Sequence, residues 1–292
     1  MSVLYFGDPR GALALLDRGV TPVGIVHGRR GGPGWSTLLT RLKRVGGEPI
    51  PRWMRPDLND PSVVGAFAAL KPRLIVASFF PRLIPPSVLA LAPGINVHPS
   101  DLPRWRGPDP CAWALRAGDA HTAICVHWLT EGLDEGDILL REVTPIGPRE
   151  HCGQLADRLE ARGAVLNAEV AVRLLGGEVI TARPQTGEVT WAPLVGDDDW
   201  EIDWSQSAQA VDARVRAAAP DPGAFTGLED ELLVITRGRA VAADRFEVLE
   251  PGTPFVRDGR FFIRCGAGAY RLDRVRLGRR TLSGKALAAL FV

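Results

Sequence analysis

Short apolar runs alternate with stretches of helical spacing along the first half of the chain. The apolar runs are rich in valine, isoleucine and leucine and cover Val3–Phe6, Val23–His27, Leu74–Ser78 and Ile95–His98. Apolar residues recur at helical intervals between them, in Gly11–Arg18, Ser36–Val45 and Ser62–Leu70. Such an alternation is typical of a parallel sheet with helices on its faces. We therefore predict an α/β domain whose ligands bind beyond the carboxyl ends of the strands.

Two more strand-like runs and one long amphipathic stretch follow. The runs cover Thr122–Leu129 and Ile138–Pro145. The amphipathic stretch extends from Cys152 to Leu175, with its leucines and valines close to one helical stripe. Gly163 interrupts the stripe midway. We predict a helix here that packs on the core of the domain.

The composition changes at Gly176–Pro193, and the acidic stretch GDDDWEIDWS that follows suits a linker. Beyond it we expect a helix at Gln206–Ala217 and four short strands, at Leu232–Thr236, Arg245–Leu249, Phe261–Cys265 and Tyr270–Val275. Several short strands within about 90 residues predict a small β-barrel. We place the α/β domain at residues 1–180, the linker at 181–204 and the barrel at 205–292.

The overall composition narrows the class of protein. Of 292 residues, 46% are hydrophobic and 24% are charged, as in an ordinary globular protein. The net charge of +1 excludes a strongly basic nucleic-acid coat, although a local basic patch remains compatible with it. The four cysteines lack C-x-x-C spacing, so we expect free thiols and no zinc site. We see no signal peptide and no apolar run as long as a membrane span, and we expect a cytoplasmic protein without a membrane partner.

Two polar motifs carry candidate chemistry. Asn96 and His98 lie two residues apart at the end of a predicted strand, so their side chains point to the same side. Asp134 lies between Gly132 and Gly136 in a turn between two strands, as in a loop that folds closely around a ligand. An amide, an imidazole and a carboxylate suit acyl transfer to an amine. Asn96 would donate to the oxyanion, His98 would share a proton, and Asp134 would orient His98 and accept the proton of the amine.

The sequence GINVHPSDLPRWRG, followed by GLDEGDI, resembles the formyltransferase family that uses 10-formyltetrahydrofolate. That family includes methionyl-tRNA, glycinamide ribonucleotide and amino-sugar formyltransferases, and its catalytic residues fall on Asn96, His98 and Asp134. VLYFGDP, PIGPREHCGQLADRLEARGAVL, TWAPLVGDDDWEIDWS and PDPGAFT resemble the flanking segments of the family. The resemblance implies a Rossmann-like formyltransferase domain, a smaller OB-like β-barrel domain at the C-terminus, 10-formyltetrahydrofolate as co-substrate and no metal.

The resemblance also implies where the folate binds. The family's folate pocket lies between the loop after the fourth strand and the loop before the catalytic aspartate, here residues 79–84 and 130–134. By position, the resemblance therefore assigns folate contacts to Phe80, Arg82, Leu83, Glu131 and Gly132.

The amine acceptor is not readable from these motifs. We favour a small molecule, an amino sugar nucleotide or a natural-product amine. The basic loop is reduced to Arg29 and Arg30, whereas methionyl-tRNA members have a longer one, and small-amine members often carry histidine at the position of His127. We assign acceptor contacts to these three residues and to Trp105, as a wall of the site.

Two alternatives stay open. The first is a methionyl-tRNA formyltransferase acting on initiator tRNA, supported by the C-terminal domain and the sequence LPRWRG. The second is a folate- or RNA-binding module without catalysis, against which the complete set of catalytic residues argues. We interpret the basic residues near the C-terminus, which include Arg274 and Arg276, as the charged face of an exposed strand rather than a phosphate site. The sequence leaves open a homodimer through the second domain.

Overall fold

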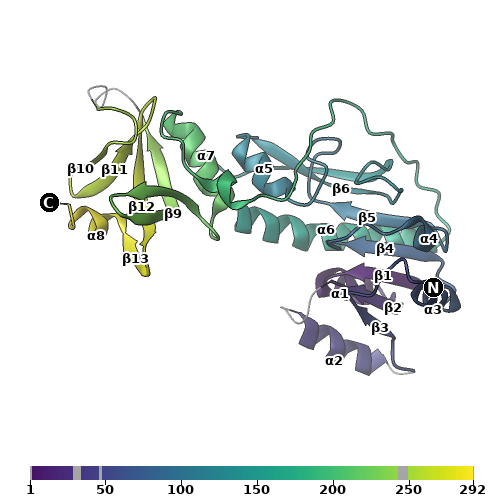
Figure 1. The fold of residues 1–292 in the computed structure, drawn as a ribbon. Helices are drawn as coiled ribbons and strands as arrows, with labels where there is room; N and C mark the ends of the chain where they lie inside the picture. The colour runs from purple at the N-terminus through teal and green to yellow at the C-terminus, as the bar shows by residue number, and fades with distance from the viewer. Residues whose placement is uncertain (1, 29–33, 46–47, 243–248, 292) are drawn as a thin grey trace. The chain divides into compact units, whose positions relative to one another are not determined.

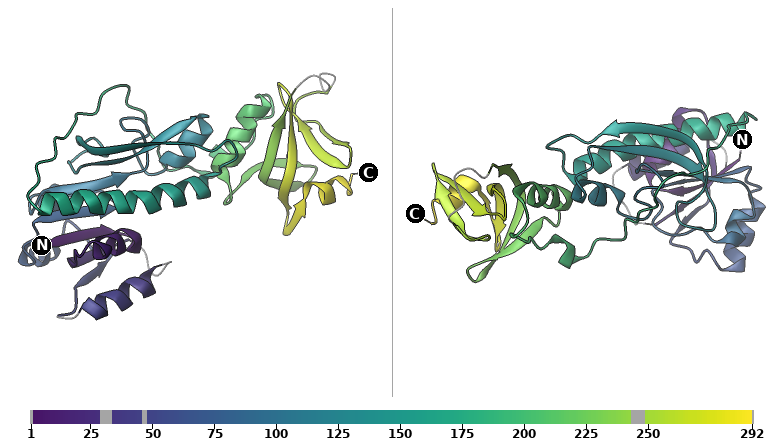
Figure 2. Two further views of the ribbon diagram at one scale, coloured as in Figure 1. Left: turned by 180° about the vertical axis from the view of Figure 1, so that it is seen from behind. Right: turned by 90° about the horizontal axis from the view of Figure 1, so that it is seen from above.

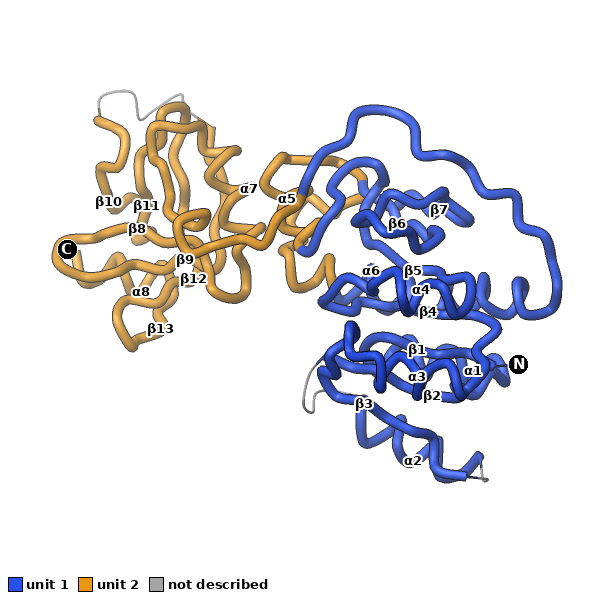
Figure 3. Tube along the Cα trace, turned by 45° about the vertical axis from the view of Figure 1, so that its right-hand side comes forward, with its two compact units in different colours: residues 1–108, 122–144, 157–191 blue, residues 109–121, 145–156, 192–292 orange. Residues whose placement is uncertain are grey.

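The computed structural model describes residues 2–28, 34–45, 48–242 and 249–291. Arg29, Arg30 and nearly all of the expected strand Arg245–Leu249 lie outside the described residues. The chain divides into two compact units, which Figure 3 colours separately. Unit 1 comprises Met1–Pro108, Thr122–Thr144 and Asp157–Trp191, and unit 2 comprises Asp109–His121, Pro145–Ala156 and Ala192–Val292.

Seven strands among the described residues form one sheet in the order β3-β2-β1-β4-β5-β6-β7 (Figure 1). These strands are β1 (Val3–Gly7), β2 (Pro22–His27), β3 (Arg52–Met54), β4 (Leu74–Ser78), β5 (Gly94–His98), β6 (His121–Trp128) and β7 (Ile138–Pro145). The first five pair in parallel, and β6 runs antiparallel to β5. The strand order reverses between β1 and β4, as in a doubly wound fold. The structure thus confirms the predicted Rossmann-like α/β fold.

The helices are α1 (Pro9–Asp17), α2 (Trp35–Val45), α3 (Pro61–Ala69), α4 (Pro86–Leu89), α5 (Pro110–Arg116) and α6 (Cys152–Leu175). Two of them begin at an aspartate followed by a proline. The Asp8 carboxylate accepts from the backbone N–H of Arg10 and Gly11, and that of Asp60 accepts from the backbone N–H of Ser62. An aspartate cap satisfies N–H groups that have no partner within the helix, which fixes where the helix begins.

Helix α6 is one continuous helix of 24 residues, despite the interruption of its apolar stripe at Gly163. Gly163 faces the sheet, where a Cβ atom would lie 3.0 Å from Val97 Cγ2 and 3.4 Å from Ile124 Cγ2. The missing side chain therefore lets the helix approach β5 and β6 closely. Further along, the buried Asn167 donates to the carbonyl oxygen of Ala77 at 2.8 Å. These contacts fix α6 against β4, β5 and β6, the strands that lead to the motifs.

The core of unit 1 lies on both faces of the central strands. Every residue of β1 and β4 is buried, as expected for parallel strands covered by helices on each side. Phe6 and Phe67 meet edge to face, with their ring centroids 5.9 Å apart. One cluster of the core contains Leu4, Phe6, Val26, Leu58, Phe67, Ile75, Ala77, Ile84 and Val88.

Six strands of the described residues form an antiparallel sheet in unit 2, in the order β10-β11-β12-β9-β8 with β13 paired to β12. They are β8 (Ala224–Leu228), β9 (Glu231–Val241), β10 (Pro254–Arg257), β11 (Arg260–Arg264), β12 (Ala269–Leu277) and β13 (Arg280–Ser283). The unit also contains the 3₁₀ helix η1 (Asp197–Trp200) and the helices α7 (Ala208–Ala218) and α8 (Gly284–Ala288). Figure 2 shows this sheet strongly twisted. The expected second, β-rich domain is thus confirmed.

Among the described residues, none of the helices has the length of apolar sequence that crossing a bilayer requires.

Candidate active site

The two motifs meet at the carboxyl end of β5. Asn96 and His98 lie on this strand, and antiparallel pairing with β6 sets Asn96 opposite His127. Asp134 lies in the loop that joins β6 to β7. In an open α/β sheet this is the edge at which ligands bind. The fold therefore brings together the three residues that the sequence analysis selected from separate segments.

Asp134 is the centre of a cluster of four polar side chains. Its Oδ1 accepts from Asn96 Nδ2 at 3.4 Å and lies 3.5 Å from His127 Nε2. Its Oδ2 lies 3.5 Å from His98 Nδ1 and accepts from the backbone N–H of Gly107 at 3.1 Å. Asn96 Nδ2 also lies 3.3 Å from His127 Nε2. One carboxylate thus contacts an amide, two imidazoles and a backbone N–H.

Backbone carbonyls determine which nitrogen of each histidine carries a proton. His98 Nε2 lies 2.8 Å from the carbonyl oxygen of Trp105, and His127 Nδ1 lies 2.8 Å from that of Trp128. A carbonyl oxygen only accepts, so we assign the proton to each of these nitrogens. In the neutral rings the lone pairs then lie on His98 Nδ1 and His127 Nε2, and both face Asp134.

Burial and charge together set the ionisation of this cluster. The side chains of His98 and Asp134 are 5% and 8% exposed. Burial lowers the pKa of His98 below its ordinary value, although the Asp134 carboxylate acts in the opposite direction. Burial alone would raise the pKa of Asp134, but the two histidines and the Gly107 N–H outweigh it and lower this pKa to about 2. At neutral pH the site therefore holds an ionised Asp134 beside a neutral His98.

The backbone around the cluster is unusual at three residues other than glycine. Phe79, Trp105 and Asp134 have φ angles of 55°, 60° and 51°. Such left-handed conformations cost on the order of 1–3 kcal/mol and persist only where the surroundings hold them. Gly136 provides part of that support, because a Cβ atom there would collide with the backbone carbonyl of Trp128. The loop of Asp134 is thus pressed against β6.

Residues 181–191 run beside both motif loops, and we name this segment the strap. Arg183 exchanges two backbone hydrogen bonds with Ile138, at 2.8 and 2.9 Å. Thr190 accepts from the backbone N–H of Trp105 through Oγ1 at 2.9 Å and from that of Arg106 through its carbonyl at 3.0 Å. The sequence predicts only a linker here, because residues 181–189 have no regular apolar spacing and TWAPLV, which begins at Thr190, resembles only a flanking segment of the family.

The expected folate contacts lie in two loops at this edge. The Phe80 ring packs edge on against Phe6, with centroids 5.3 Å apart, and the Arg82 guanidinium lies 5.3 Å from the centre of the Phe80 ring. Leu83 is 60% exposed. Glu131 is exposed, and the Gly132 carbonyl accepts from Thr130 Oγ1 at 3.3 Å. Their roles in folate binding stay predictions.

The expected acceptor contacts have different surroundings. Trp105 is half-buried, with the Arg104 guanidinium 4.5 Å from the centre of its ring. His127 is only 1% exposed and belongs to the interior of the cluster. Arg29 and Arg30 lie outside the described residues. Within the described part of the chain, no group of three or more side chains is placed to bind a metal ion.

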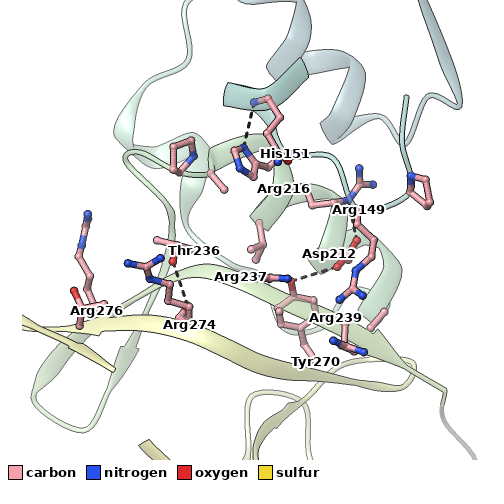
Figure 4. A pocket seen from close by; sticks show the side chains of 18 residues that line it. Arg149, His151, Asp212, Arg216, Thr236, Arg237, Arg239, Tyr270, Arg274 and Arg276 are labelled. Atoms are coloured by element: carbon pink, nitrogen blue, oxygen red, sulfur yellow. Dashed lines mark hydrogen bonds and ion pairs between the residues drawn. The ribbon is translucent and has the colours of Figure 1, made fainter. Parts of the chain in front are cut away.

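A second feature, within unit 2, is a cavity of about 830 Å³ that we name the arginine pocket (Figure 4). Asp212 is the single carboxylate among its described lining residues, and it pairs with Arg216 at 2.9 Å. Arg237 and Arg274 are exposed and lie directly opposite each other on β9 and β12. The arginines that line the pocket are Arg149, Arg216, Arg237, Arg239, Arg274 and Arg276.

Comparisons with known proteins match both units. A family model described as formyl transferase matches residues 37–170, and one described as formyl transferase, C-terminal domain, matches residues 195–291. A protein of Syntrophus aciditrophicus named methionyl-tRNA formyltransferase is 36% identical over 264 residues, which cover 87% of this chain and 83% of that protein.

Two solved structures have a similar fold. HypX from Aquifex aeolicus, in complex with tetrahydrofolic acid, has a TM-score of 0.66 and 18% identity, covering 99% of this chain and 47% of that one. The N-formyltransferase from Helicobacter canadensis, with folinic acid and dTDP-3-aminofucose, has a TM-score of 0.70 and 12% identity, covering 92% and 97%.

Our preference for a small-molecule acceptor is wrong. Relatives that are 32% to 40% identical over three quarters of the chain or more are named methionyl-tRNA formyltransferase. The structures of sugar N-formyltransferases are 11% to 18% identical, so that they are similar in fold alone. His127 does not identify a small-molecule acceptor, because its side chain is 1% exposed and lies 3.5 Å from Asp134; its role in acceptor binding stays a prediction. Arg29 and Arg30, the other basis of this preference, lie outside the described residues.

Proposed function

The chain belongs to the formyl transferase family, and we propose that it transfers the formyl group of 10-formyltetrahydrofolate to the amino group of methionyl-tRNA. Membership of the family confirms the expected class of enzyme, a folate-dependent formyltransferase. The observation that carries the proposal is the convergence of Asn96, His98 and Asp134 at the carboxyl end of β5. The proposal includes initiator tRNA as acceptor and a cytoplasmic location.

In the proposed reaction Asn96 stabilises negative charge on the formyl oxygen. As the amine nitrogen bonds to the formyl carbon, this oxygen gains charge that an N–H donor can stabilise. The contacts of Asn96 Nδ2 with Asp134 and His127, at 3.4 and 3.3 Å, are longer than ordinary N–H hydrogen bonds. The amide is therefore held weakly enough to direct one N–H to the substrate.

His98 Nδ1 is the base of the proposed reaction. The attacking amine must lose a proton, and the nitrogen of the folate that releases the formyl group must gain one. Asp134 is a weak proton acceptor, because its pKa is about 2. The lone pair of the neutral His98 faces this carboxylate, which stabilises the imidazolium that forms when Nδ1 takes the proton. The same nitrogen then returns the proton to the folate as the old C–N bond breaks.

The arginine pocket supports an RNA acceptor. Three of its six arginines pair with carboxylates, Arg216 with Asp212, Arg239 with Asp273 and Arg276 with Asp221, so the pocket keeps an excess of positive charge. Like charges directly opposite each other on a sheet, as Arg237 and Arg274 are, repel each other and destabilise the fold. A phosphate between them would remove this repulsion, and RNA supplies phosphates at regular intervals.

The proposal is tested by an acceptor assay. Purified protein is incubated with 10-formyltetrahydrofolate and either methionyl-tRNA or a dTDP-linked amino sugar. We expect formylmethionyl-tRNA to accumulate and the amino sugar to stay unmodified. Formylation of the sugar alone would contradict the proposal.

A charge substitution tests the arginine pocket. We expect Arg237→Ala and Arg274→Ala to weaken the binding of methionyl-tRNA and to lower the slope of log K against log salt by about 1 for each phosphate that the variant no longer neutralises. Each substitution should also raise the free energy of unfolding of the free protein, because it removes the repulsion across β9 and β12.

Arg73→Ala is the matched control, since Arg73 is exposed and precedes the amino end of β4, opposite the edge that carries the site. It should leave both the salt slope and kcat unchanged. Equal salt slopes in the wild type and in the two pocket variants would show that the arginine pocket does not bind the phosphates of tRNA.

A further inference from the structure

The side chain of Gln185, in the strap, joins the two motif loops. Its Nε2 donates to the carbonyl oxygens of Asp134 and Gly136, each at 2.8 Å. Its Oε1 accepts from Nε and Nη2 of Arg106, at 3.1 and 2.8 Å. The residue after Arg106 is Gly107, whose N–H binds the Asp134 carboxylate. One amide therefore holds both the backbone of Asp134 and the segment that contacts its carboxylate.

The orientation of this amide follows from its partners. On one side lie two carbonyl oxygens, which only accept, and on the other lies a guanidinium, which only donates. Reversing the amide would bring acceptors against acceptors and donors against donors. All four hydrogen-bonding positions of the Gln185 amide are thus used. Because the side chain is half-buried, only this orientation of the amide satisfies all of its partners.

The strap supports both of the left-handed residues that orient the proposed base and its carboxylate. Asp134, with φ of 51°, is held at its carbonyl by Gln185. Trp105, with φ of 60°, is held at its N–H by Thr190 and presents its carbonyl to His98 Nε2. Left-handed conformations are uncommon for residues other than glycine and persist where surrounding contacts hold them.

We propose that Gln185 is a positioning residue of the formyl transfer reaction, which holds the Asp134 carboxylate against His98 by fixing the backbone of the Asp134 loop. The inference rests on the proposed function for its kinetic consequences, but the geometry on which it depends does not involve either substrate. Gln185 contacts neither the carboxylate nor an imidazole, so its effect passes through Asp134 and Gly107.

Two substitutions distinguish the role of the Gln185 N–H donors from that of its carbonyl oxygen. Gln185→Glu keeps an acceptor for Arg106 but loses both N–H donors to the Asp134 loop, whereas Gln185→Ala loses all four bonds. We expect both variants to lose about 10- to 100-fold in kcat, because a misplaced catalytic group costs rate on this scale. The KM values for the folate and for the tRNA should stay close to those of the wild type. Full activity of Gln185→Glu would show that the two N–H donors to the Asp134 loop are not needed, and would overturn the proposal.

Gln209→Glu is the matched control, since Gln209 is exposed on α7 and the same change of charge there should leave kcat unchanged. A second measurement does not need either substrate. The chain has five histidines, so the NMR titration of His98 can be assigned by comparison with His98→Ala.

In the Gln185 variants the His98 titration should move to lower pH, because the carboxylate that favours the imidazolium has receded. An unchanged titration in folded Gln185→Glu would overturn the proposal even if the wild type formylates methionyl-tRNA. A wild type that fails to formylate methionyl-tRNA, with a shifted His98 titration in the variants, would contradict the proposed function alone.

Discussion

Replacing Asp134 with asparagine should lower kcat by about 10²- to 10⁴-fold, the range typical of lost acid–base assistance. Asparagine keeps the size of the side chain but has no charge to stabilise the imidazolium of His98, which lies 3.5 Å away. The KM values should change little, because the carboxylate is 8% exposed and acts on proton transfer more than on binding. Steady-state kinetics with methionyl-tRNA measures both, and a wild-type kcat in Asp134→Asn would contradict the mechanism.

The same substitution should change how stability depends on pH. The folded-state pKa of Asp134 is about 2, below the ordinary value of 3.8, so the folded state favours the ionised form. Its contribution to stability, about 2 kcal/mol from the size of the shift, is therefore complete only above about pH 5 and is lost progressively as the pH falls through the folded-state pKa of about 2. Urea unfolding at several pH values should show Asp134→Asn less stable than the wild type at pH 7, with the difference shrinking in acid.

Replacing His98 with alanine should also lower kcat by about 10²- to 10⁴-fold, because the proposed reaction then has no base beside Asp134. Burial holds the pKa of His98 below its ordinary value, so the wild type should stay active at pH 6.5 and lose activity only at lower pH, as Nδ1 becomes protonated. His98→Ala should lack this acid limb. A pH profile of kcat between pH 5 and 8 tests both points.

His121→Ala is the control, since His121 is exposed at the start of β6, away from Asp134. It should match the wild type in both kcat and pH profile. If His98→Ala keeps the acid limb of the wild type, another group must be the base.

Much of unit 1 could be predicted because its strands are buried on both faces. The strands β1, β2, β4 and β5 appear in the sequence as apolar runs, which is the pattern that parallel pairing under two layers of helices requires. The edge strand β3 has only three residues, with exposed arginine and methionine, and leaves no such run. The residues of the proposed site were found because two motifs with polar side chains follow strands, where the fold gathers ligands.

The remaining features depend on contacts between distant segments. Gln185 has no spacing or motif that marks it, and its importance lies in carbonyl groups some fifty positions away in the chain. The arginine pocket assembles from α7, β9, β12, β13 and the chain around the start of α6. In the sequence, Arg274 and Arg276 are ordinary charges on a strand, and only the pairing of β12 with β9 sets Arg274 opposite Arg237.

The strap has a consequence for how the enzyme can be divided. All seven strands of the unit 1 sheet and the proposed catalytic residues Asn96, His98 and Asp134 precede the end of α6 at Leu175, so a fragment that stops there contains all of them. That fragment would nevertheless lack Gln185 and Thr190, which form hydrogen bonds with the loops of Asp134 and Trp105. An expression fragment, or a domain exchange between relatives, should therefore be cut after Trp191, so that Gln185 and Thr190 stay with the two loops.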